Sequence, residues 1–514
     1  MKGRKVLFII IDQLRADCLH GALADHVDLP NIRRFCDEAV SFERHYSVTN
    51  PCGPSRASLF TGLYAMNHRS VRNGTPLAAH HTNVALEMRK AGHDPLLFGY
   101  TDTTHDPRTG HPRDPRLLSY EGVLPGFHEI IEMAMDQSYP WRAHLKKKGY
   151  QLPDYSRIWA PVSPDPSRPP RPDDPPFYRA EDSDTAFLTD AFLQQMAVRT
   201  DQDWFALLTY LRPHPPLVAP EPYNRMYDPS TLPEPVRRPS PEEEEAVHPY
   251  IAAHRRTPSL GDTVVGCGEG LDERRDEDVQ LLRALYLGLA TEVDHHLGRI
   301  MDFLKKTGQY DETLILVTAD HGEMLGDHHM WGKSHVYEPA WHIPLIIRDP
   351  ARPEGHGTRV QALTETIDLA PTILEACGRP VPAAMDGRPL CDFLEGRTPT
   401  DWKDAIMMEL EFGDPDHPRP LQEALNLPLR DTNLAILREE RYKLVHFNAG
   451  LPPLLFDLHE DPGEMNDLAG DPAHRDTLLR LTQRLLSHRM SHADHTLSAM
   501  KATAGGVVNF TPGA

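Results

Sequence analysis

Short apolar runs alternate with longer amphipathic segments along most of the chain. Residues 6–11 form an uninterrupted apolar run that ends at Asp12, which is typical of a strand buried on both faces of a parallel sheet. Similar runs follow at 95–99, 204–211, 313–318 and 344–347. Between 278 and 304, apolar residues recur at helical spacing and predict one long amphipathic helix. This alternation predicts an α/β fold with a large, mostly parallel central sheet flanked by helices.

Beyond residue 400 the pattern changes to short strands. We expect antiparallel strands at 405–411, 434–438 and 442–447, and a helix over 471–489 with an N-cap at its start. The chain is therefore predicted to have a large α/β domain over 1–400 and a smaller α+β subdomain over 401–490. The tail, 491–514, has no clear period, and we expect it either to be disordered or to form an arm that packs on another subunit.

Composition and charge narrow the classes of function. Of the 514 residues, 75 are acidic and 54 basic, and the resulting net charge of -21 repels nucleic acid and anionic lipid. Six cysteines without CxxC spacing indicate neither a disulfide framework nor a zinc knuckle. The first apolar run is too short for a signal peptide, and no run reaches the length of a membrane span. We expect a cytoplasmic protein without nucleic-acid or membrane partners.

Polar residues follow two of the predicted strands. Asp12 and Gln13 come after the first strand, and Asp320 and His321 come after the strand at 313–318. Ligands of open α/β sheets bind beyond the carboxyl ends of the strands, so these four residues are predicted to meet there. A simple N-cap is the alternative for either aspartate. Two carboxylates, an amide and an imidazole suit Ca²⁺, Mn²⁺ and Zn²⁺ without selecting sharply among them. Two proline-rich stretches, 161–176 and 213–241, are predicted to form surface walls around this pocket.

The most specific motif is Cys52-Gly-Pro-Ser-Arg56, followed by Ala-Ser-Leu-Phe-Thr-Gly up to residue 62. An isolated cysteine before a helix is most often a small buried hydrophobe. This cysteine precedes a predicted helix, whose free amide groups favour anions. A thiolate is a soft ligand and fits poorly beside carboxylates that suit hard cations.

These motifs together resemble the sulfatase family of the alkaline phosphatase superfamily, in which such a motif directs oxidation of the cysteine to formylglycine. Within that superfamily the chain is similar to bacterial phosphonate monoester hydrolases and related arylsulfatases. The likeness runs nearly end to end, and implies an alkaline phosphatase-like fold. It is carried by residues 11–13, 51, 66–69, 99–101, 106–108, 212–216, 326–329 and 453–458.

The resemblance implies a formylglycine- and metal-dependent hydrolase that accepts sulfate esters, phosphonate monoesters and phosphodiesters. The cofactors would be formylglycine, made from Cys52 by a formylglycine-generating enzyme, and one divalent metal ion. Ca²⁺ and Mn²⁺ are the first candidates for that ion, and Zn²⁺ is the third. The metal ligands would be Asp12, Gln13, oxidised Cys52, Asp320 and His321. A small anionic ester would be the substrate, and the family suggests a homo-oligomer, either a tetramer or a dimer.

Further site residues follow from the same resemblance. Cys52 would be the nucleophile once oxidised, and Arg56, one helical turn further on, can hydrogen-bond its hydrate. Lys333 matches a lysine that contacts the substrate anion. His214 matches a histidine near the leaving-group oxygen, to which it could donate a proton.

Two more residues are implied as donors to the nonbridging oxygens of the substrate, namely Asn73 and Tyr100. The sequence departs from the phosphonate hydrolase pattern at Asp102, where a threonine is expected. A carboxylate there repels an anionic substrate unless it is protonated, turned away or bound to a cation.

Two other functions fit the same residues. The first is a phosphatase or phosphodiesterase of the superfamily in which Cys52 stays a thiol. Mass spectrometry of the peptide that contains Cys52 separates it from the sulfatase interpretation, because formylglycine has no sulfur. The second is a non-enzymatic anion-binding or assembly protein, which would keep its role after Asp12→Ala or Asp320→Ala.

Overall fold

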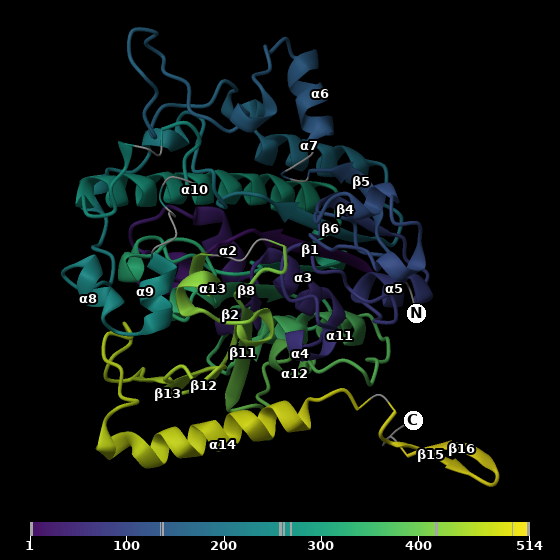
Figure 1. Cartoon of the computed structure of the whole chain (residues 1–514). Coiled ribbons are helices and arrows are strands. Elements are labelled where there is room, and N and C mark those ends of the chain that lie inside the picture. The colour runs from purple at the N-terminus through teal and green to yellow at the C-terminus, as the bar shows by residue number, and fades with distance from the viewer. Residues whose placement is uncertain are drawn as a thin grey trace.

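A computed structural model describes residues 4–510 apart from 134, 136–137, 256–259, 261–262, 268–269, 417–419 and 496. Its core is a nine-stranded sheet with helices on both faces, and a second, five-stranded sheet lies beside it (Figure 1). The predicted α/β class and the predicted C-terminal subdomain with small strands are confirmed. None of the helices in the described ranges is long and apolar enough to cross a bilayer.

The central sheet has the strand order β10-β2-β8-β7-β1-β6-β4-β5, and β9 pairs with β2. Its strands are β1 (Lys5–Ile11), β2 (Val40–Tyr46), β4 (Pro95–Gly99), β5 (His128–Glu132), β6 (Phe205–Tyr210), β7 (Thr313–Thr318), β8 (His342–Arg348), β9 (Arg359–Val360) and β10 (Thr364–Glu365). The pairs around β1 are parallel, as predicted, but β8 runs antiparallel to both β7 and β2.

Fourteen α-helices are described. They are α1 (Asp17–His20), α2 (Pro30–Asp37), α3 (Cys52–Thr61), α4 (Ala65–His68), α5 (Val84–Lys90), α6 (Tyr139–Lys147), α7 (Asp184–Ala197), α8 (Pro241–Glu245), α9 (Pro249–Arg255), α10 (Asp276–Lys306), α11 (Leu369–Ala376), α12 (Cys391–Leu394), α13 (Pro420–Leu425) and α14 (Arg475–Ser491). The predicted helix at 278–304 is α10, which extends two residues further at each end.

The alternation of side chains along β1 divides the core into two layers. Leu7, Ile9 and Ile11 pack with residues of α2, α7 and α10, whereas Phe8 and Ile10 pack with residues of α3, α5 and α11. Because both faces are covered by helices, every residue of β1 is buried. Ligand-binding residues are therefore expected at the strand ends, beyond the two helical layers.

The second sheet joins the C-terminal part of the chain to the rest. Its order is β14-β13-β12-β11-β3, with β11 (Ala405–Glu411), β12 (Asn433–Glu439), β13 (Tyr442–Phe447) and β14 (Leu454–Asp457) antiparallel to one another. The two-residue strand β3 (Thr49–Asn50) lies just before Cys52 and pairs parallel with β11. The second sheet thus contacts the chain next to the most specific motif. The boundary at residue 400 stays a prediction.

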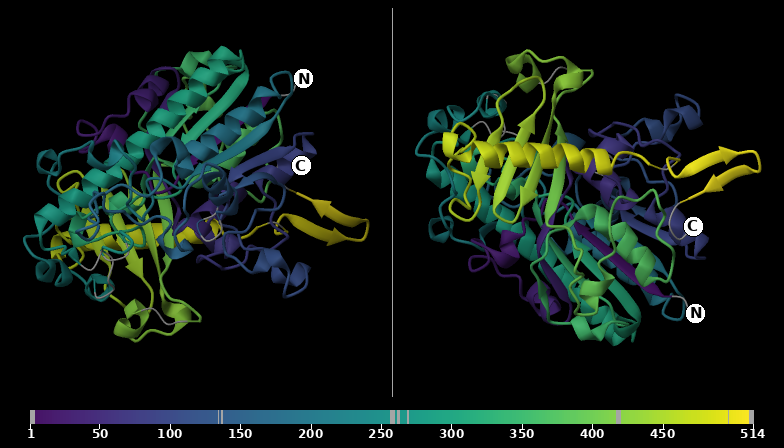
Figure 2. Two further views of the ribbon diagram at one scale, coloured as in Figure 1. Left: turned by 90° about the horizontal axis from the view of Figure 1, so that it is seen from above. Right: turned by 90° about the horizontal axis from the view of Figure 1, so that it is seen from below.

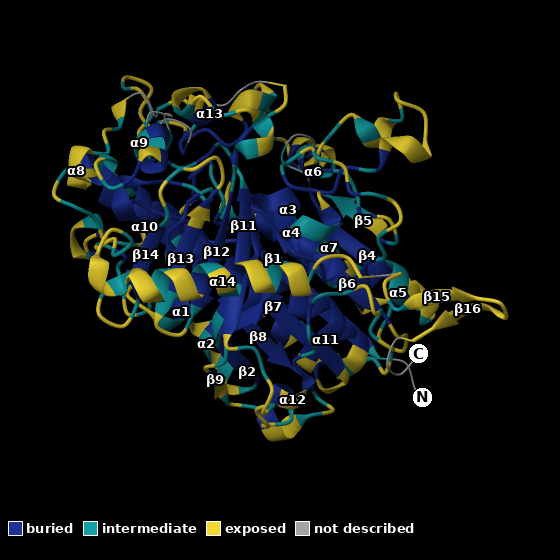
Figure 3. Ribbon diagram, turned by 60° about the horizontal axis from the view of Figure 1, so that its bottom comes forward, coloured by how far each residue is buried: buried dark blue, intermediate teal, exposed yellow. Residues whose placement is uncertain are grey.

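The C-terminal tail forms a hairpin that projects from the body. α14 packs on the second sheet through Leu481 and Leu485. Beyond it, β15 (Met500–Thr503) and β16 (Gly506–Asn509) pair with each other in a separate two-stranded sheet, and all eight residues are exposed (Figures 1 and 2). In Figure 3 the hairpin and the outward side of α14 carry the colour of exposed residues.

Candidate active site

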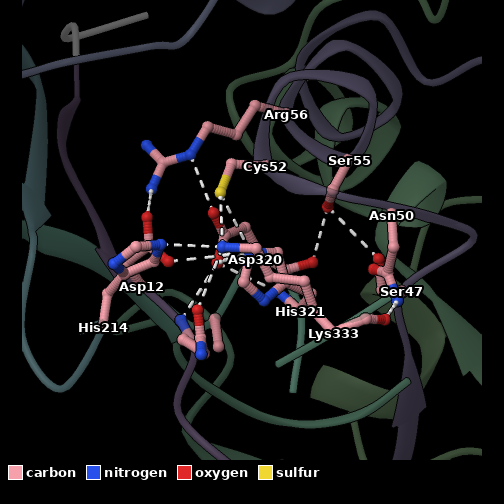
Figure 4. A network of polar contacts seen from close by, with 12 residues as sticks. Asp12, Ser47, Asn50, Cys52, Ser55, Arg56, His214, Asp320, His321 and Lys333 are labelled. Carbon is pink, nitrogen blue, oxygen red and sulfur yellow. Dashed lines mark hydrogen bonds and ion pairs between the residues drawn. The ribbon is translucent and has the colours of Figure 1, made fainter. Parts of the chain in front are cut away.

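The register of the central sheet brings two aspartates together. Ile10 of β1 lies opposite Thr318 of β7, so that Asp12 and Asp320, each two residues further on, leave the same edge of the sheet side by side. The N-terminus of α3 points at this edge and begins with Cys52. In Figure 4 the side chains of Asp12, Cys52, Asp320 and His321 converge on one point.

These four side chains form a compact set of ligand atoms. One atom from each of Asp12, Cys52, Asp320 and His321 lies within 4.8 Å of every other, and all four residues are buried. Oδ1 of Asp12 is buried without a hydrogen-bond partner among the described residues. An unpaired buried carboxylate oxygen is costly, and a cation beside it would remove that cost. The donor set therefore fits a divalent metal ion.

Gln13 lies at the edge of this set. Its backbone φ is 67°, and its N–H donates to Asp320 over 3.2 Å. The side-chain oxygen accepts from Lys333 over 3.0 Å, and the side-chain nitrogen donates to Glu323. The structure thus holds the predicted amide ligand next to the four converging atoms, with its orientation fixed by two partners.

Arg56 is the fixed cation of the site. It is fully buried, and its guanidinium donates to Asp320 over 2.9 Å and to Asp12 over 3.1 Å. These two carboxylates are its partners in the structure, and the predicted hydrogen bond from Arg56 to the hydrate of oxidised Cys52 stays a prediction. Although burial opposes it, the charges of His321, Arg56 and Lys333 hold the pKa of Asp320 below its usual value. Burial, and then Asp320, raise the pKa of Asp12.

Asp102 also faces Arg56, with 3.6 Å between Oδ2 and Nε. It has a φ of 49° and is buried, and its Oδ1 has no hydrogen-bond partner among the described residues. Burial raises the pKa of Asp102 to about 7, against the opposing effect of Arg56. Near neutral pH this carboxyl group is therefore partly protonated, which weakens its repulsion of an anion.

A second cation, Lys333, contacts the sulfur of Cys52. Its Nζ lies 3.1 Å from Cys52 Sγ, and 2.7 Å from Nε2 of His214. Nδ1 of His214 lies 2.5 Å from the carbonyl oxygen of Pro215, to which it donates, so Nε2 accepts from the lysine. Burial, and then Lys333, lower the pKa of His214, while Cys52, Asp12 and Asp320 raise the pKa of Lys333 despite its burial. The pair therefore holds its extra proton on the lysine.

The other predicted residues also lie at the site. His321 Nε2 is 3.1 Å from Cys52 Sγ, and burial lowers the pKa of His321 to about 4. Tyr100 donates its hydroxyl to Oδ2 of Asp12 over 2.7 Å. Asn73 accepts from the N–H of Gly53 through Oδ1 over 2.9 Å, next to residue 52.

Three residues that sequence reasoning left without a role hold the site together. Ser55 donates to the carbonyl of Asp320 over 2.5 Å, and Asn50 donates to the carbonyl of Lys333 over 2.8 Å. Glu323 accepts from Gln13 and from two backbone N–H groups. Ser55 lies inside the Cys52 motif and Glu323 lies two residues after His321, so their positions were a usable signal. Asn50 carried none beyond its closeness to Cys52.

A cavity of about 320 Å³ opens beside Lys333 and His214. Gln13 and Glu323 add polar groups to its wall. The rest is largely apolar or aromatic, and is formed by Met135, Pro215, Pro216, Leu217, Tyr286, Leu325 and Trp331. Part of this wall comes from the predicted proline-rich stretch 213–241.

Comparison with known proteins gives concordant matches. The family model described as Sulfatase matches residues 4–379, and that described as N-sulphoglucosamine sulphohydrolase, C-terminal, matches residues 326–491. The multifunctional alkaline phosphatase superfamily protein PehA of Trinickia caryophylli is 40% identical, over 99% of each chain. An arylsulfatase of Clostridium perfringens is 25% identical over 94% of this chain and 93% of its own.

Two solved structures are similar over almost the whole chain. A phosphonate monoester hydrolase from Silicibacter pomeroyi is 56% identical, with a TM-score of 0.95, over 98% of this chain and 99% of its own. The phosphonate monoester hydrolase of Agrobacterium radiobacter is 40% identical, with a TM-score of 0.92, over 99% of this chain and 100% of its own.

Proposed function

The chain belongs to the sulfatase family of hydrolases, in the alkaline phosphatase superfamily, and from that premise we propose that it hydrolyses phosphonate monoesters and sulfate esters with formylglycine at position 52. Phosphodiesters are expected as further substrates. One observation carries the proposal: the sulfur of Cys52 lies within 4.8 Å of ligand atoms of Asp12, Asp320 and His321, and 3.1 Å from Lys333. A buried cysteine without a chemical role packs among apolar side chains instead.

Asp12, Asp320, His321 and the oxidised residue 52 would hold the divalent ion, with Gln13 as a further oxygen ligand. Ca²⁺ and Mn²⁺ are our first candidates, since carboxylate and amide oxygens dominate the set, and Zn²⁺ is the third. When bound, the ion supplies positive charge that acidifies a hydroxyl of hydrated formylglycine and offsets the charge of an anionic substrate. The unpaired Oδ1 of Asp12 supports this assignment.

Lys333 and His214 would act as a proton-donating pair. The lysine carries the extra proton and donates a hydrogen bond to Nε2 of the imidazole. Transfer along this bond gives an imidazolium and a neutral amine. Either form of the pair can give one proton to the departing oxygen, which otherwise leaves as an anion.

Arg56 and Tyr100 would orient the carboxylates. Arg56 bonds Asp12 and Asp320 together, and Tyr100 donates to Asp12. Asn73 is anchored on Gly53 through its oxygen, which leaves its amide nitrogen as a candidate donor to a nonbridging oxygen of the substrate. Asp102, partly protonated near pH 7, would favour substrates with a single negative charge over dianions.

Sulfate esters and phosphonate monoesters are both singly charged tetrahedral anions, so one site can stabilise the transition states of both. The largely apolar walls of the 320 Å³ cavity favour a hydrophobic leaving group beside Lys333 and His214. Promiscuity among such esters is therefore the expected behaviour.

The proposal is tested by two measurements on one preparation, made in a host that contains a formylglycine-generating enzyme. Mass spectrometry of the peptide containing residue 52 should show formylglycine. Nitrophenyl esters should then be turned over when they carry sulfate, phosphonate monoester or phosphodiester groups, and more slowly when they carry dianionic phosphate. An active protein with an unmodified thiol, or one that hydrolyses phosphate monoesters alone, would contradict it.

We also propose that the tail mediates assembly into a homo-oligomer, a tetramer or a dimer. The hairpin and the preceding residues expose large apolar side chains, including Leu497, Val507 and Phe510, which are 62–71% exposed. Such a surface is costly in water unless another chain covers it. Analytical ultracentrifugation should give a multiple of 58.0 kDa for the full chain and a smaller assembly for a variant that ends at residue 491. An unchanged assembly in the truncated protein would exclude this role.

Cytoplasmic residence is a further part of the proposal. The six cysteines are all free thiols in the structure, as expected where disulfides do not form. Cell fractionation of the native host tests it, and recovery from the medium or the periplasm would contradict it.

A further inference from the structure

Behind His214 lies a buried polar cluster that none of the steps above uses. It is formed by Arg212, Asp184, Ser183 and Glu292, each at most 3% exposed. Arg212 follows β6, Ser183 and Asp184 begin α7, and Glu292 lies in the middle of α10. The cluster therefore connects the segment that carries His214 to two long helices.

Arg212 fixes the backbone around His214. Its Nη1 donates to the carbonyl oxygen of Pro216 over 2.7 Å and to that of His214 over 3.2 Å. The carbonyl between these two belongs to Pro215, and it accepts from Nδ1 of the His214 ring. Three successive carbonyls are thus engaged, two by the guanidinium and one by the imidazole. The direction of Nε2 toward Lys333 depends on this arrangement.

Asp184 holds Arg212 from the other side, with 3.1 Å between Oδ2 and Nε. Asp184 is itself fixed at the first turn of α7, where Ser183 caps the helix by accepting from the N–H of Ala186 over 3.0 Å. The hydroxyl of Ser183 donates to Glu292 over 2.6 Å, which ties the cap to α10. The guanidinium therefore has a rigid support that reaches two helices.

The buried cluster around Arg212 and Asp184 lowers the stability of the fold. Within the described ranges, buried side-chain atoms without a hydrogen-bond partner occur on Glu292, Thr185 and Trp159. Each such atom costs about 1–3 kcal/mol relative to a satisfied one. Apolar residues of similar volume would pack at least as stably as a buried ion pair. Polar clusters that violate the packing rules are expected where function requires them.

We propose that Arg212 and Asp184 are positioning residues for His214, holding its imidazole in the direction that receives and delivers the proton for the leaving group. The inference rests on the proposed role of the Lys333–His214 pair. It predicts an effect that depends on the leaving group, because a good leaving group departs without a proton whereas a poor one needs it.

The test compares Arg212→Lys with His214→Ala on two esters of the same acid, one with 4-nitrophenolate and one with phenolate as leaving group. His214→Ala should lower kcat strongly for the phenyl ester and much less for the nitrophenyl ester. Arg212→Lys should show the same selectivity, with kcat for the phenyl ester reduced about tenfold and KM little changed. Combining the two substitutions should add almost nothing to His214→Ala alone.

Arg348→Lys is the matched control. Arg348 is also buried, donates to a backbone carbonyl, that of Tyr310, over 2.7 Å, and pairs with Asp311 over 2.7 Å. It lies opposite Ile315, near the start of β7 and away from the strand ends that form the site. Its substitution should lower the melting temperature without changing the ratio of the two kcat values.

Asp184→Asn provides a second variant that keeps the shape of the side chain, in case Arg212→Lys does not fold. It should show the same selectivity as Arg212→Lys, to a smaller degree. Equal losses on both esters, or a loss that persists in the His214→Ala background, would overturn the positioning role. If His214→Ala itself shows no selectivity, the proton-donating role of His214 fails, and the positioning role fails with it.

Discussion

Asp12 and Asp320 at the site have a counterpart in Glu365 and Asp368, a second pair of buried carboxylates. The second pair is closed by protein groups: Lys403 donates to both carboxylates over 2.7–2.9 Å, and Tyr64 donates to Glu365 over 2.9 Å. None of its side-chain atoms is among the buried unpaired ones in the described part of the chain. At the site, Arg56 donates to both Asp12 and Asp320, but Oδ1 of Asp12 has no hydrogen-bond partner among the residues that the structure describes.

We infer that Glu365 and Asp368 stabilise the fold, whereas Asp12 and Asp320 bind a ligand. Lys403 and Tyr64 hydrogen-bond the carboxylates of Glu365 and Asp368, so removing Lys403 should destabilise the fold and leave the reaction unchanged. Asp12 and Asp320 instead leave one buried carboxylate oxygen, Oδ1 of Asp12, without a hydrogen-bond partner in the described part of the chain, and a divalent ion bound there would remove that cost. Four experiments follow, from the largest expected effect to the smallest.

Asp12→Asn should lower kcat/KM by about a thousandfold or more, because the ion loses a charged ligand. The metal-free variant should be at least as stable as the metal-free parent. Burial and Asp320 raise the pKa of Asp12, so ionising this carboxyl group costs more free energy in the folded chain than in the unfolded one. The folded state of the parent therefore loses stability as the pH rises above about 3.9, the pKa of an aspartate in the unfolded chain. Metal-free samples are compared by thermal denaturation at pH 7. A marked loss of stability in the variant would place Asp12 with the fold-supporting pair.

Lys403→Met should lower the stability of the protein and leave its activity unchanged, in contrast to Asp12→Asn. It leaves Glu365 and Asp368 facing each other without a cation, and should lower the free energy of unfolding by about 3 kcal/mol. Urea denaturation measures that loss, and kcat per folded molecule should stay within about twofold of the parent. A selective loss of activity would mean that this pair also serves the reaction.

Divalent ions should stabilise the metal-free parent. At a concentration of one hundred times Kd the expected gain is about 2.7 kcal/mol, seen as a higher melting temperature. Ca²⁺, Mn²⁺ and Zn²⁺ are added separately to rank them. The rise in melting temperature should be mostly lost in Asp12→Asn and kept in Lys403→Met. Equal rises in both variants would show that the ion binds elsewhere.

Tyr100→Phe should reduce kcat/KM about tenfold, since it removes the hydroxyl that orients Asp12. Tyr64→Phe is the matched control, because the same change there removes a donor to Glu365. It should lower the melting temperature and leave kcat unchanged. Similar kinetics for the two variants would contradict the separation of the two pairs.

Much of the fold could be predicted from the sequence because its strands are buried on both faces and read as continuous apolar runs. The run at 6–11 and the run at 313–318 both proved to be strands, and their ends bring Asp12 and Asp320 together. The direction of β8 could not be predicted, since an apolar run reads the same for a parallel or an antiparallel strand. The strand β3 has only two residues and carries no periodic signal.

The residue types of the site were also readable, but their partners were not. Cys52 and Asp320 stood out through short motifs at recognisable positions. The contact between Lys333 and His214 joins loops 119 positions apart, and no local pattern encodes it. For the same reason the ion pairs of Arg56 with Asp12 and Asp320 were not predicted, since the register of β1 and β7 brings these two carboxylates together.

The most direct test of the account is a crystal structure of the protein grown with Mn²⁺, with anomalous diffraction measured at the manganese edge. We expect one strong anomalous peak between Asp12, Asp320, His321 and residue 52, at bonding distance from oxygens of both aspartates. A protein that is active with Mn²⁺ and yet shows no peak there, or shows its only peak elsewhere, would contradict the central claim.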